Sequence, residues 1–281
     1  MAYDKVVDST VLENGLSSIA DAIREKTGTG GTLTFPSGFV SAIEGFSGGG
    51  ATEPYIEETY DANGQLIDAV MHGYTSIRPY AFQHCSVLVS VSGISAITSI
   101  GNYAFSQCSN LALTSLPAGI TSIGNNAFDS CVQLALTSMP SGISSIGNNT
   151  FYYCSNLALT SLPAGITSIG NSAFYRCSKL ALTSLPAGIT SIGNNAFNSC
   201  GKLALTSMPA GITSIGSYSF SNCTGLTTIT FEGTPQSIDS HAFSGSTKLT
   251  TVNVPWAEGA VAGAPWGATN ATINYNYTPE G

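Results

Sequence analysis

Seven cysteines are the most reactive side chains of this sequence, and they recur every 23 residues. They are Cys85, Cys108, Cys131, Cys154, Cys177, Cys200 and Cys223. In a stack of equivalent turns, neighbouring cysteines would have Cβ atoms about 5 Å apart, whereas a disulfide needs about 3.8 Å. A metal site needs ligands that converge on one point, and a row of thiols does not converge. The spacing therefore predicts buried, reduced thiols that pack as small apolar side chains.

A cluster of aromatic and basic residues is the second candidate for chemistry. It comprises Tyr152, Tyr153, Tyr175 and Arg176, with Lys179 and Lys202 nearby. Tyrosine and arginine are enriched at the energetic centres of interfaces, and the same groups stack on sugar rings. The alternative is sequence drift at exposed turns that have no role. The pattern predicts that a binding surface, where the protein has one, uses these six residues.

Catalytic arrangements are not expected. Residues 45–49 match G-x-S-x-G, but they follow a predicted helix and run into glycines, instead of lying between a strand and a helix. His84 and His241 occupy variable turn positions, and His72 falls in a predicted hairpin. No phosphate-binding loop, carboxylate pair or metal-ligand cluster stands out in the sequence. We therefore expect a protein that is not an enzyme and has no metal or cofactor.

Phenylalanines follow the same period as the cysteines. They are Phe82, Phe105, Phe128, Phe151, Phe174, Phe197, Phe220 and Phe243, and the first seven each precede a cysteine by three positions. A fixed period of about 20 to 50 residues is the signature of a solenoid. A unit this small cannot bury its phenylalanine alone, so the core must form by stacking equivalent residues from turn to turn.

Three short segments are predicted within each unit. Residues 111–116 follow an L-x-L-x-x-L pattern, and residues 134–139 follow it with Met139 in the last position; this indicates a strand with one apolar face. Residues 120–123 form a second apolar step after a Pro-x-Gly turn. Residues 127–131 space Ala, Phe and Cys so as to suit one helical or 3₁₀ turn. The pattern predicts an α/β solenoid that is mainly β.

The element I-x-x-I-G-x-x-A-F-x-x-C-x-x-L resembles the BspA-like class of leucine-rich repeat. The resemblance covers residues 74–254 and predicts eight turns, of which the last has Ser246 in place of the cysteine and Asp239 in place of the glycine. It implies a right-handed solenoid whose relatives serve mainly in adhesion and surface recognition.

Composition and charge narrow the possible partners. Only 9% of the 281 residues are charged and the net charge is −8, whereas ordinary domains have about a quarter charged residues. This argues against nucleic-acid binding. The sequence lacks an apolar run of the roughly 18 residues that a membrane span needs. Residues 1–5 also lack the pattern of a signal peptide, so export by the ordinary secretory route is not expected.

Residues 1–46 form a separate region in which two amphipathic helices are predicted, one ending near Lys26 and one starting at Ser37. They are expected to mediate oligomerisation or docking; the alternative is that they pack on each other or on the solenoid. Residues 47–54 form a glycine-rich hinge. Residues 16–43 resemble the opening of many phage and prophage structural proteins of Gram-positive bacteria. That resemblance implies binding to other virion proteins, assembly in the bacterial cytoplasm, and a homo-oligomer, which is a trimer by analogy with tail fibres.

The ends of the repeat array are predicted to be capped. Residues 55–73 contain two alternating segments around Asp61-Ala-Asn-Gly64, a strong hairpin signal. Residues 255–281 form the second cap, with Trp256, Trp266 and a final strand near Ala271. Together these features predict a tail-associated virion protein that recognises a host-surface glycan or protein. The alternatives are a BspA-like surface adhesin exported by an unconventional route, and an inert scaffold with regular hydroxyl rows.

Overall fold

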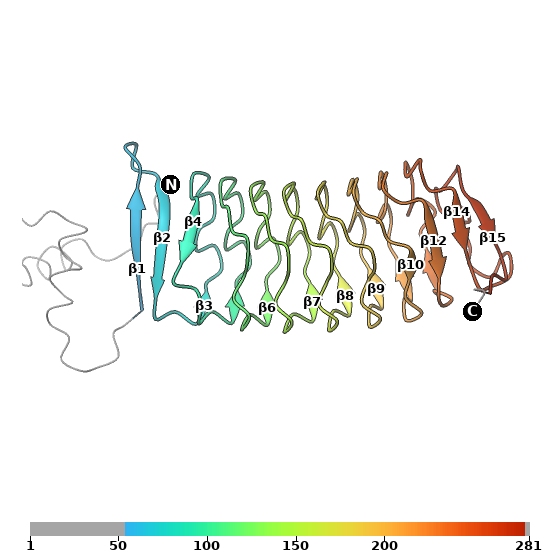
Figure 1. Ribbon diagram of the computed structural model, residues 1–281, viewed down its shortest axis with the longest axis horizontal. Helices are drawn as coiled ribbons and strands as arrows, with labels where there is room; N and C mark the ends of the chain where they lie inside the picture. Colours follow the sequence, from blue (N-terminus) through green and yellow to red (C-terminus); the bar gives the residue numbers. More distant parts are fainter. Residues whose placement is uncertain (1–53, 279–281) are drawn as a thin grey trace, which may run out of the picture. The chain divides into compact units, whose positions relative to one another are not determined.

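Residues 54–278 are described by the computed structural model, and they form a β-solenoid of about nine turns (Figure 1). The sequence predicted eight turns. The difference arises at the C-terminal end, where Thr251 pairs with Thr272 in parallel register, so that the predicted cap winds once more around the axis. The predicted helices of residues 1–46 and most of the hinge at 47–54 lie outside the described residues.

Fifteen short strands are present in the described part of the chain. In order, they are β1 (Tyr55–Tyr60), β2 (Leu66–His72), β3 (Ser76–Ile77), β4 (Ser90–Ser92), β5 (Ser99–Ile100), β6 (Ser122–Ile123), β7 (Ser145–Ile146), β8 (Ser168–Ile169), β9 (Ser191–Ile192), β10 (Ser207–Met208), β11 (Ser214–Ile215), β12 (Thr228–Phe231), β13 (Ser237–Ile238), β14 (Thr251–Asn253) and β15 (Thr272–Asn274). Residues 54–278 contain no helix, so the α component predicted for the repeats is wrong.

The Ser-Ile dipeptides build two parallel sheets with the 23-residue register of the repeat. Their strand orders are β3-β5-β6 and β13-β11-β9-β8-β7. The strand of the repeat therefore falls on the isoleucine step instead of on the predicted leucine segment. In the central turns, each leucine segment keeps one backbone hydrogen bond to the preceding turn. An example is the bond from the Ala158 amide to the Leu136 carbonyl at 3.1 Å.

Proline explains why the leucine segments of the central turns form almost no strand. Pro117, Pro140, Pro163, Pro186 and Pro209 follow these segments in five consecutive turns. A proline has no amide hydrogen and interrupts a sheet ladder. Towards the ends of the array, strands reappear at β4 and in the ladder β10-β12-β14-β15. In this ladder Glu232 takes the place of the proline, and its amide donates to the Met208 carbonyl of the preceding turn at 3.0 Å.

The predicted helical turn is instead a run of hydrogen-bonded turns with alternating backbone handedness. Asn126 and Ser130 have left-handed φ values of 56° and 60°, and equivalent residues repeat this along the solenoid. The amide of Phe128 donates to the carbonyl of Thr150 in the next turn at 2.9 Å. With this backbone conformation, every second amide of the segment points towards the next turn and donates a hydrogen bond to it. A helix would not allow such bonds, because its amides bond within the helix.

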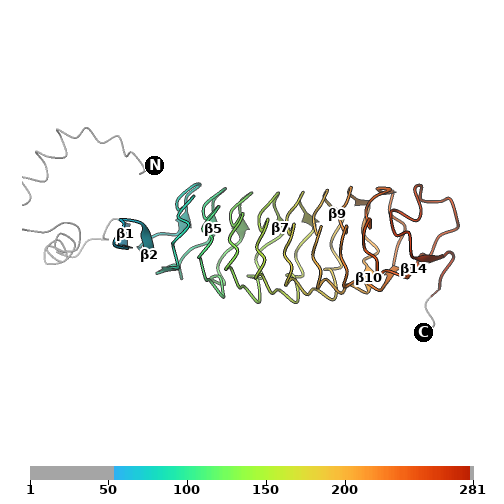
Figure 2. The ribbon, with the colours of Figure 1, turned by 90° about the horizontal axis from the view of Figure 1, so that it is seen from above.

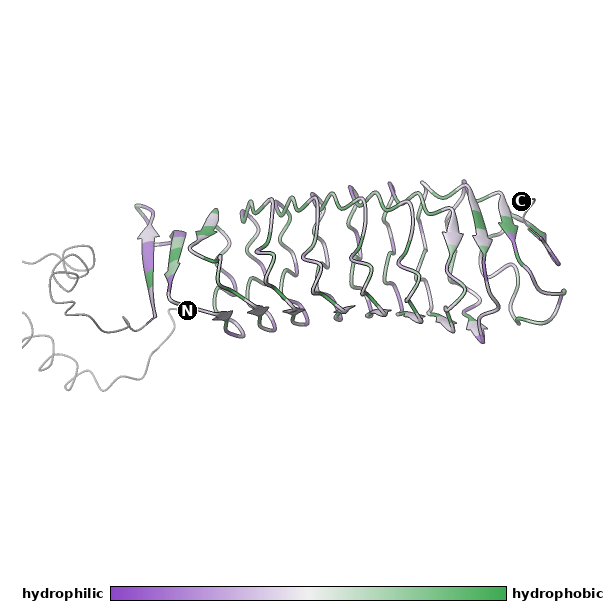
Figure 3. Cartoon of the chain, turned by 60° about the horizontal axis from the view of Figure 1, so that its bottom comes forward, coloured by the Kyte–Doolittle hydropathy of each residue, from purple (hydrophilic) through white to green (hydrophobic). Residues whose placement is uncertain are grey.

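The core consists of rows of identical side chains along the solenoid axis, and the hydropathy pattern repeats from turn to turn (Figure 3). Successive phenylalanine rings from Phe82 to Phe243 stack with centroids 5.3–5.6 Å apart. All eight are buried. This confirms the predicted phenylalanine row.

The cysteine row lies beside the phenylalanines and makes its own hydrogen bonds. The Sγ of Cys154 donates to the carbonyl of Phe128 at 3.0 Å, and the same bond recurs from Cys108 to Cys223. Ser246, which takes the cysteine position in a later turn, keeps this bond through its hydroxyl at 2.7 Å from the Phe220 carbonyl. All seven cysteines are free thiols; Cys85, in the first turn, is only half-buried.

Both ends of the array carry additional structure (Figure 2). Strands β1 and β2 form the predicted antiparallel hairpin, and β2 pairs in parallel with β4. The Asp61 carboxylate accepts hydrogen bonds from the amides of Asn63 and Gln65 at 2.9 and 2.8 Å, which fixes the turn. At the other end, Trp256 packs edge-on against Trp266, and both rings are buried.

Candidate binding site

The turn segments carry the predicted cluster, and their backbone holds its side chains outward. The amides of Asn149, Phe151 and Tyr153 donate bonds of 2.8–2.9 Å to carbonyls of the next turn. The Phe151 side chain points into the core, whereas Tyr152 and Tyr153 remain partly exposed. Tyr153 and Arg176 have left-handed φ values of 57° and 59°. This conformation is uncommon for bulky residues, and the interturn bonds stabilise it.

Four residues of the predicted site meet as a two-by-two array on adjacent turns. Tyr152 stacks on Tyr175 with ring centroids 4.9 Å apart and an interplanar angle of 9°. The Arg176 guanidinium carbon lies 4.9 Å from the Tyr153 ring centroid and 5.5 Å from that of Tyr175. Arg176 also donates a hydrogen bond to the Tyr153 hydroxyl. The structure thus brings these four residues into mutual contact.

The two lysines predicted with the cluster lie on the same and the following turn. Lys179 is three positions after Arg176, and Lys202 is its equivalent one repeat later. Both side chains are exposed. Neither makes a hydrogen bond or ion pair within the described part of the chain. Their inclusion in the site therefore depends on position alone and stays a prediction.

The electrostatic surroundings of the array act on Tyr152 and on Asp129. Partial burial raises the pKa of Tyr152, and the neighbouring tyrosines and Asp129 raise it further. Asp129 lies one repeat before Tyr152, and its carboxylate accepts a hydrogen bond from the Ser130 hydroxyl at 2.8 Å. Burial raises the pKa of Asp129 as well. At neutral pH, Tyr152 is therefore a hydrogen-bond donor.

Two further aromatic pairs on the turns were missed by the sequence analysis. Tyr80 stacks on Tyr103 at 5.2 Å, and Tyr218 stacks on His241 at 5.1 Å. Each pair occupies the position two before the phenylalanine on adjacent turns, so the 23-residue spacing was the signal that could have revealed them. No cation lies over the Tyr218–His241 pair within residues 54–278, unlike Arg176 over its tyrosines.

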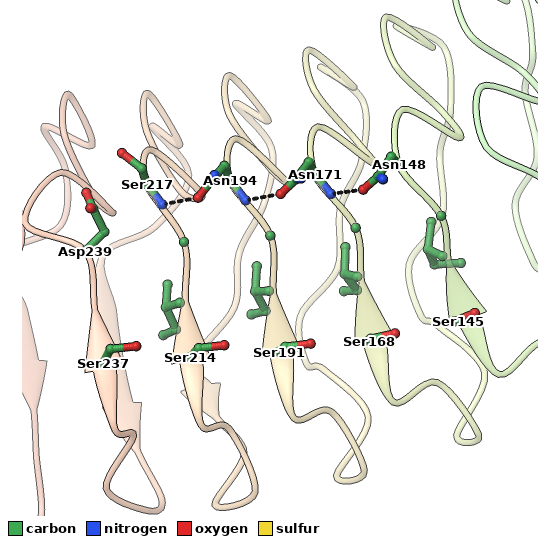
Figure 4. Close-up of a pocket in the computed structure, with 18 of the residues that line it drawn as sticks. Ser145, Asn148, Ser168, Asn171, Ser191, Asn194, Ser214, Ser217, Ser237 and Asp239 are labelled. Atoms are coloured by element: carbon green, nitrogen blue, oxygen red, sulfur yellow. Dashed lines mark hydrogen bonds between the residues drawn. The ribbon is translucent and has the colours of Figure 1, made fainter.

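A shallow groove along the sheet of strands β7, β8, β9, β11 and β13 is a second surface that sequence analysis did not identify (Figure 4). Its volume is about 680 Å³, and its lining repeats Ser-Ile-Gly-Asn. The side-chain oxygen of Asn171 accepts a hydrogen bond from the backbone amide of Asn194 at 2.8 Å, and the equivalent bond recurs from turn to turn. A Cβ on Gly170 would lie 2.7 Å from the Gly147 carbonyl carbon, so glycine is required for this close approach.

The groove offers hydroxyl and amide groups but little to anchor a ligand. Ser168 and its equivalents project along it, and Asp239 is the charged residue of the lining. The amide of His241 donates to the Asp239 carboxylate, which lowers the pKa of that group. This regular polar surface agrees with the hydroxyl rows considered for a scaffold. The asparagine side chains of the groove stabilise the stack, because each bonds to the backbone of the next turn.

Histidine 241 has neighbours that resemble a catalytic triad only in composition. Its Nδ1 lies 3.0 Å from the Ser240 hydroxyl and 3.5 Å from the Asp239 carboxylate. A triad needs the serine and the aspartate at opposite ring nitrogens, and here both contact the same one. His84 Nδ1 lies 3.0 Å from the Gln107 side-chain oxygen in the next turn. Residues 45–49, with the G-x-S-x-G match, lie outside the described residues.

Metal and membrane sites were also sought in the described residues. Residues 54–278 hold no group of three or more His, Cys, Asp or Glu side chains placed to bind a metal ion. The same residues include no helix with the length and apolarity that a membrane crossing requires.

The repeat pattern of the BspA type leucine-rich repeat region matches residues 75–204 and 146–258 in six copies. The chain belongs to the BspA-type leucine-rich repeat family. Repeat solenoids of this family are typically not enzymes. Comparison with the curated proteins gives no significant match.

Solved structures of several proteins, leucine-rich repeat proteins among them, are similar to this chain. A leucine-rich repeat protein from Bacteroides ovatus is 22% identical over 71% of this chain, with a TM-score of 0.54, and this chain covers 58% of that protein. A leucine rich cell surface protein from Faecalibacterium prausnitzii is 19% identical, with coverage of 82% and 96% and a TM-score of 0.42. The pneumococcal vaccine antigen PcpA is 20% identical, with coverage of 69% and 55% and a TM-score of 0.46.

Proposed function

We propose that this chain is a surface-recognition protein, an adhesin without enzymatic activity, that binds a glycan or protein on a cell surface through Tyr152, Tyr153, Tyr175 and Arg176. The observation that carries this is the two-by-two array itself. It combines stacked rings, a guanidinium over two of them and partial exposure. Membership of the BspA-type family adds the surface recognition expected of such relatives.

The array is a better anchor than the serine groove for physical reasons. Aromatic rings bring large contact area with little loss of conformational freedom, and aromatic residues and arginine dominate binding energies at interfaces. The interturn hydrogen bonds of Tyr153 and Arg176 hold their backbone in place before a ligand arrives. A site held in advance in this way loses less entropy on binding.

The interpretation as a tail-associated virion protein is a narrower statement than surface recognition. It depends on the resemblance of residues 16–43, which lie outside the described residues, and none of the similarities above supports it. Attachment to virion proteins through residues 1–46, trimer formation and location in a virion remain predictions.

A cell-binding assay tests the proposed function. The full chain, fluorescently labelled, is titrated onto a panel of intact bacterial and eukaryotic cells and measured by flow cytometry. The combined variant Tyr152→Ala, Tyr175→Ala, Arg176→Ala should bind at least about tenfold more weakly, a loss of about 1.4 kcal/mol. Its circular dichroism should match the wild type.

The pair Tyr80→Ala, Tyr103→Ala provides the matched control, because it removes an exposed aromatic stack from another turn. This control variant should bind as the wild type does. Equal loss in both variants would mean that aromatic area in general, and not this array, causes binding. A wild-type protein that binds no cell type would favour the inert scaffold.

A further inference from the structure

Arg176 has binding capacity that the protein leaves unused. Within residues 54–278, the ion pairs join His72 to Glu57 and His241 to Asp239, and none involves Arg176. Within these residues its guanidinium makes one hydrogen bond, which goes to the Tyr153 hydroxyl. A guanidinium has five N–H donors in a planar fork that fits carboxylate and phosphate groups. Most of these donors are therefore available to an anionic ligand.

The charges around Arg176 form a positive region on a negative protein. From Ser86 to Phe231 the charged residues are Asp129, Arg176, Lys179 and Lys202, whereas the whole chain has a net charge of −8. The three basic residues fall on two adjacent turns. Asp129 lies two repeats before Tyr175, the neighbour of Arg176, and its carboxylate accepts a hydrogen bond from the Ser130 hydroxyl. A single-sign patch of this kind raises the local concentration of an oppositely charged ligand.

Tyrosine hydroxyls next to this positive region add neutral donors. The hydroxyls of Tyr152 and Tyr175 make no hydrogen bond within the described residues. Adjacent turns are separated by about 4.8 Å, the spacing of paired strands. The basic residues and the tyrosines therefore repeat along the axis, and an extended ligand could contact two turns at once.

We infer that the ligand of this site is an anionic glycan, a polymer whose carboxylate or phosphate groups pair with Arg176, Lys179 and Lys202 while its sugar or polyol units contact Tyr152 and Tyr175. This inference rests on the proposed function and names the class of surface ligand. Arg176 is the central contact, because it is the cation held in place by the rings. The two lysines extend the contact to the next turn.

Calorimetric titration of the full chain tests the inference with defined polymers. Polygalacturonic acid supplies carboxylates, poly(glycerol phosphate) supplies phosphates, and neutral dextran is the uncharged comparison. We expect at least one of the two anionic polymers to bind and dextran not to bind, and the stronger of the two identifies the anionic group. Raising NaCl from about 50 mM to about 500 mM should weaken binding at least tenfold, because the charges are exposed to screening.

Two variants of equal charge separate this site from general electrostatics. Arg176→Gln should weaken binding at least tenfold, whereas Arg78→Gln, which removes an exposed arginine from the first turn, should change it by less than twofold. Equal effects of the two variants, equal binding of dextran, or binding of neither anionic polymer would overturn the inference. Cell binding that needs the array but is not competed by either polymer would leave the proposed function standing without the inference. Polymer binding that requires Arg176, without binding to any cell, would support the anionic ligand and contradict the proposed function.

Discussion

At the scale of single residues, the position before each core phenylalanine shows how closely the turns pack. It is alanine in most turns, but Thr150 and Ser219 occupy it in two of them, and both are fully buried. The Thr150 hydroxyl donates to the Gly124 carbonyl at 3.3 Å. The Ser219 hydroxyl has no hydrogen-bond partner among residues 54–278. A buried hydroxyl without a hydrogen bond costs about 1–3 kcal/mol.

Replacing Ser219 by alanine should therefore stabilise the protein. We expect Ser219→Ala to raise the free energy of unfolding by about 1 kcal/mol, because it removes the unpaired hydroxyl and restores the residue found in other turns. Thr150→Ala is the control; it loses a satisfied hydrogen bond and a buried methyl group, and it should destabilise. Guanidinium titration followed by circular dichroism measures both. A destabilised Ser219→Ala would mean that the hydroxyl makes a favourable contact.

At the scale of structural elements, the cysteine row couples stability to pH. Burial raises the pKa of the Cys131, Cys154 and Cys177 thiols well above their ordinary value, and raises that of Cys223 to about 12. The folded protein therefore keeps these thiols protonated at a pH where the unfolded chain ionises. For such groups, the stabilisation is complete below the unfolded pKa, about 8.5, and decreases as the pH rises above it.

We expect the free energy of unfolding to fall by several kcal/mol between about pH 8 and about pH 10, since each buried thiol contributes up to about 1.4 kcal/mol per pH unit. Guanidinium titrations under reducing conditions at a series of pH values measure this. Cys154→Ala should flatten the dependence by one thiol's share. Thiol counting at about pH 8 in the native protein should detect Cys85 first, because it is only half-buried. Stability independent of pH across this range would contradict the burial of the row.

The elements of the repeat were predictable to different degrees. The rows of Phe and Cys followed from spacing alone, since a 23-residue period places equivalent residues side by side. The location of the strands did not, because the leucine segment has the better apolar alternation, yet Pro140 and its equivalents remove donors from its ladder. The predicted helical turn at 127–131 failed because left-handed φ values at Asn126 and Ser130 depend on interturn hydrogen bonds. No local pattern reports such bonds.

The candidate site shows the same limit. That Tyr152, Tyr175 and Arg176 lie together could be predicted, because positions 23 residues apart are neighbours in the stack. Their tilt, and the cation placed over two rings, depend on the left-handed backbone at Tyr153 and Arg176. The serine groove was not predicted, although its lining repeats Ser-Ile-Gly-Asn every 23 residues, because a hollow depends on the shape of packed turns and not on a local pattern.

At the scale of the whole solenoid, each turn contacts only its neighbours, so stability depends on continuity of the stack. Phe151 is fully buried between Phe128 and Phe174, at 5.6 and 5.5 Å from their ring centroids. Phe82 lies at the beginning of the row and stacks on Phe105 alone. In a one-dimensional array, a weak interface in the middle divides the cooperative unit, whereas one at the end allows local fraying.

Phe151→Ala should therefore differ from Phe82→Ala in the form of unfolding as well as in its magnitude. We expect Phe151→Ala to cost about 3–5 kcal/mol as a core truncation, and to broaden or split the guanidinium transition, because the turns on either side unfold separately. Phe82→Ala should cost less, keep a single transition, and increase amide hydrogen exchange only in the first turns. Hydrogen exchange read by mass spectrometry localises both effects. A single sharp transition in Phe151→Ala, with exchange raised evenly along the chain, would show that the solenoid unfolds as one unit and that coupling between turns is stronger than the stacked rings provide.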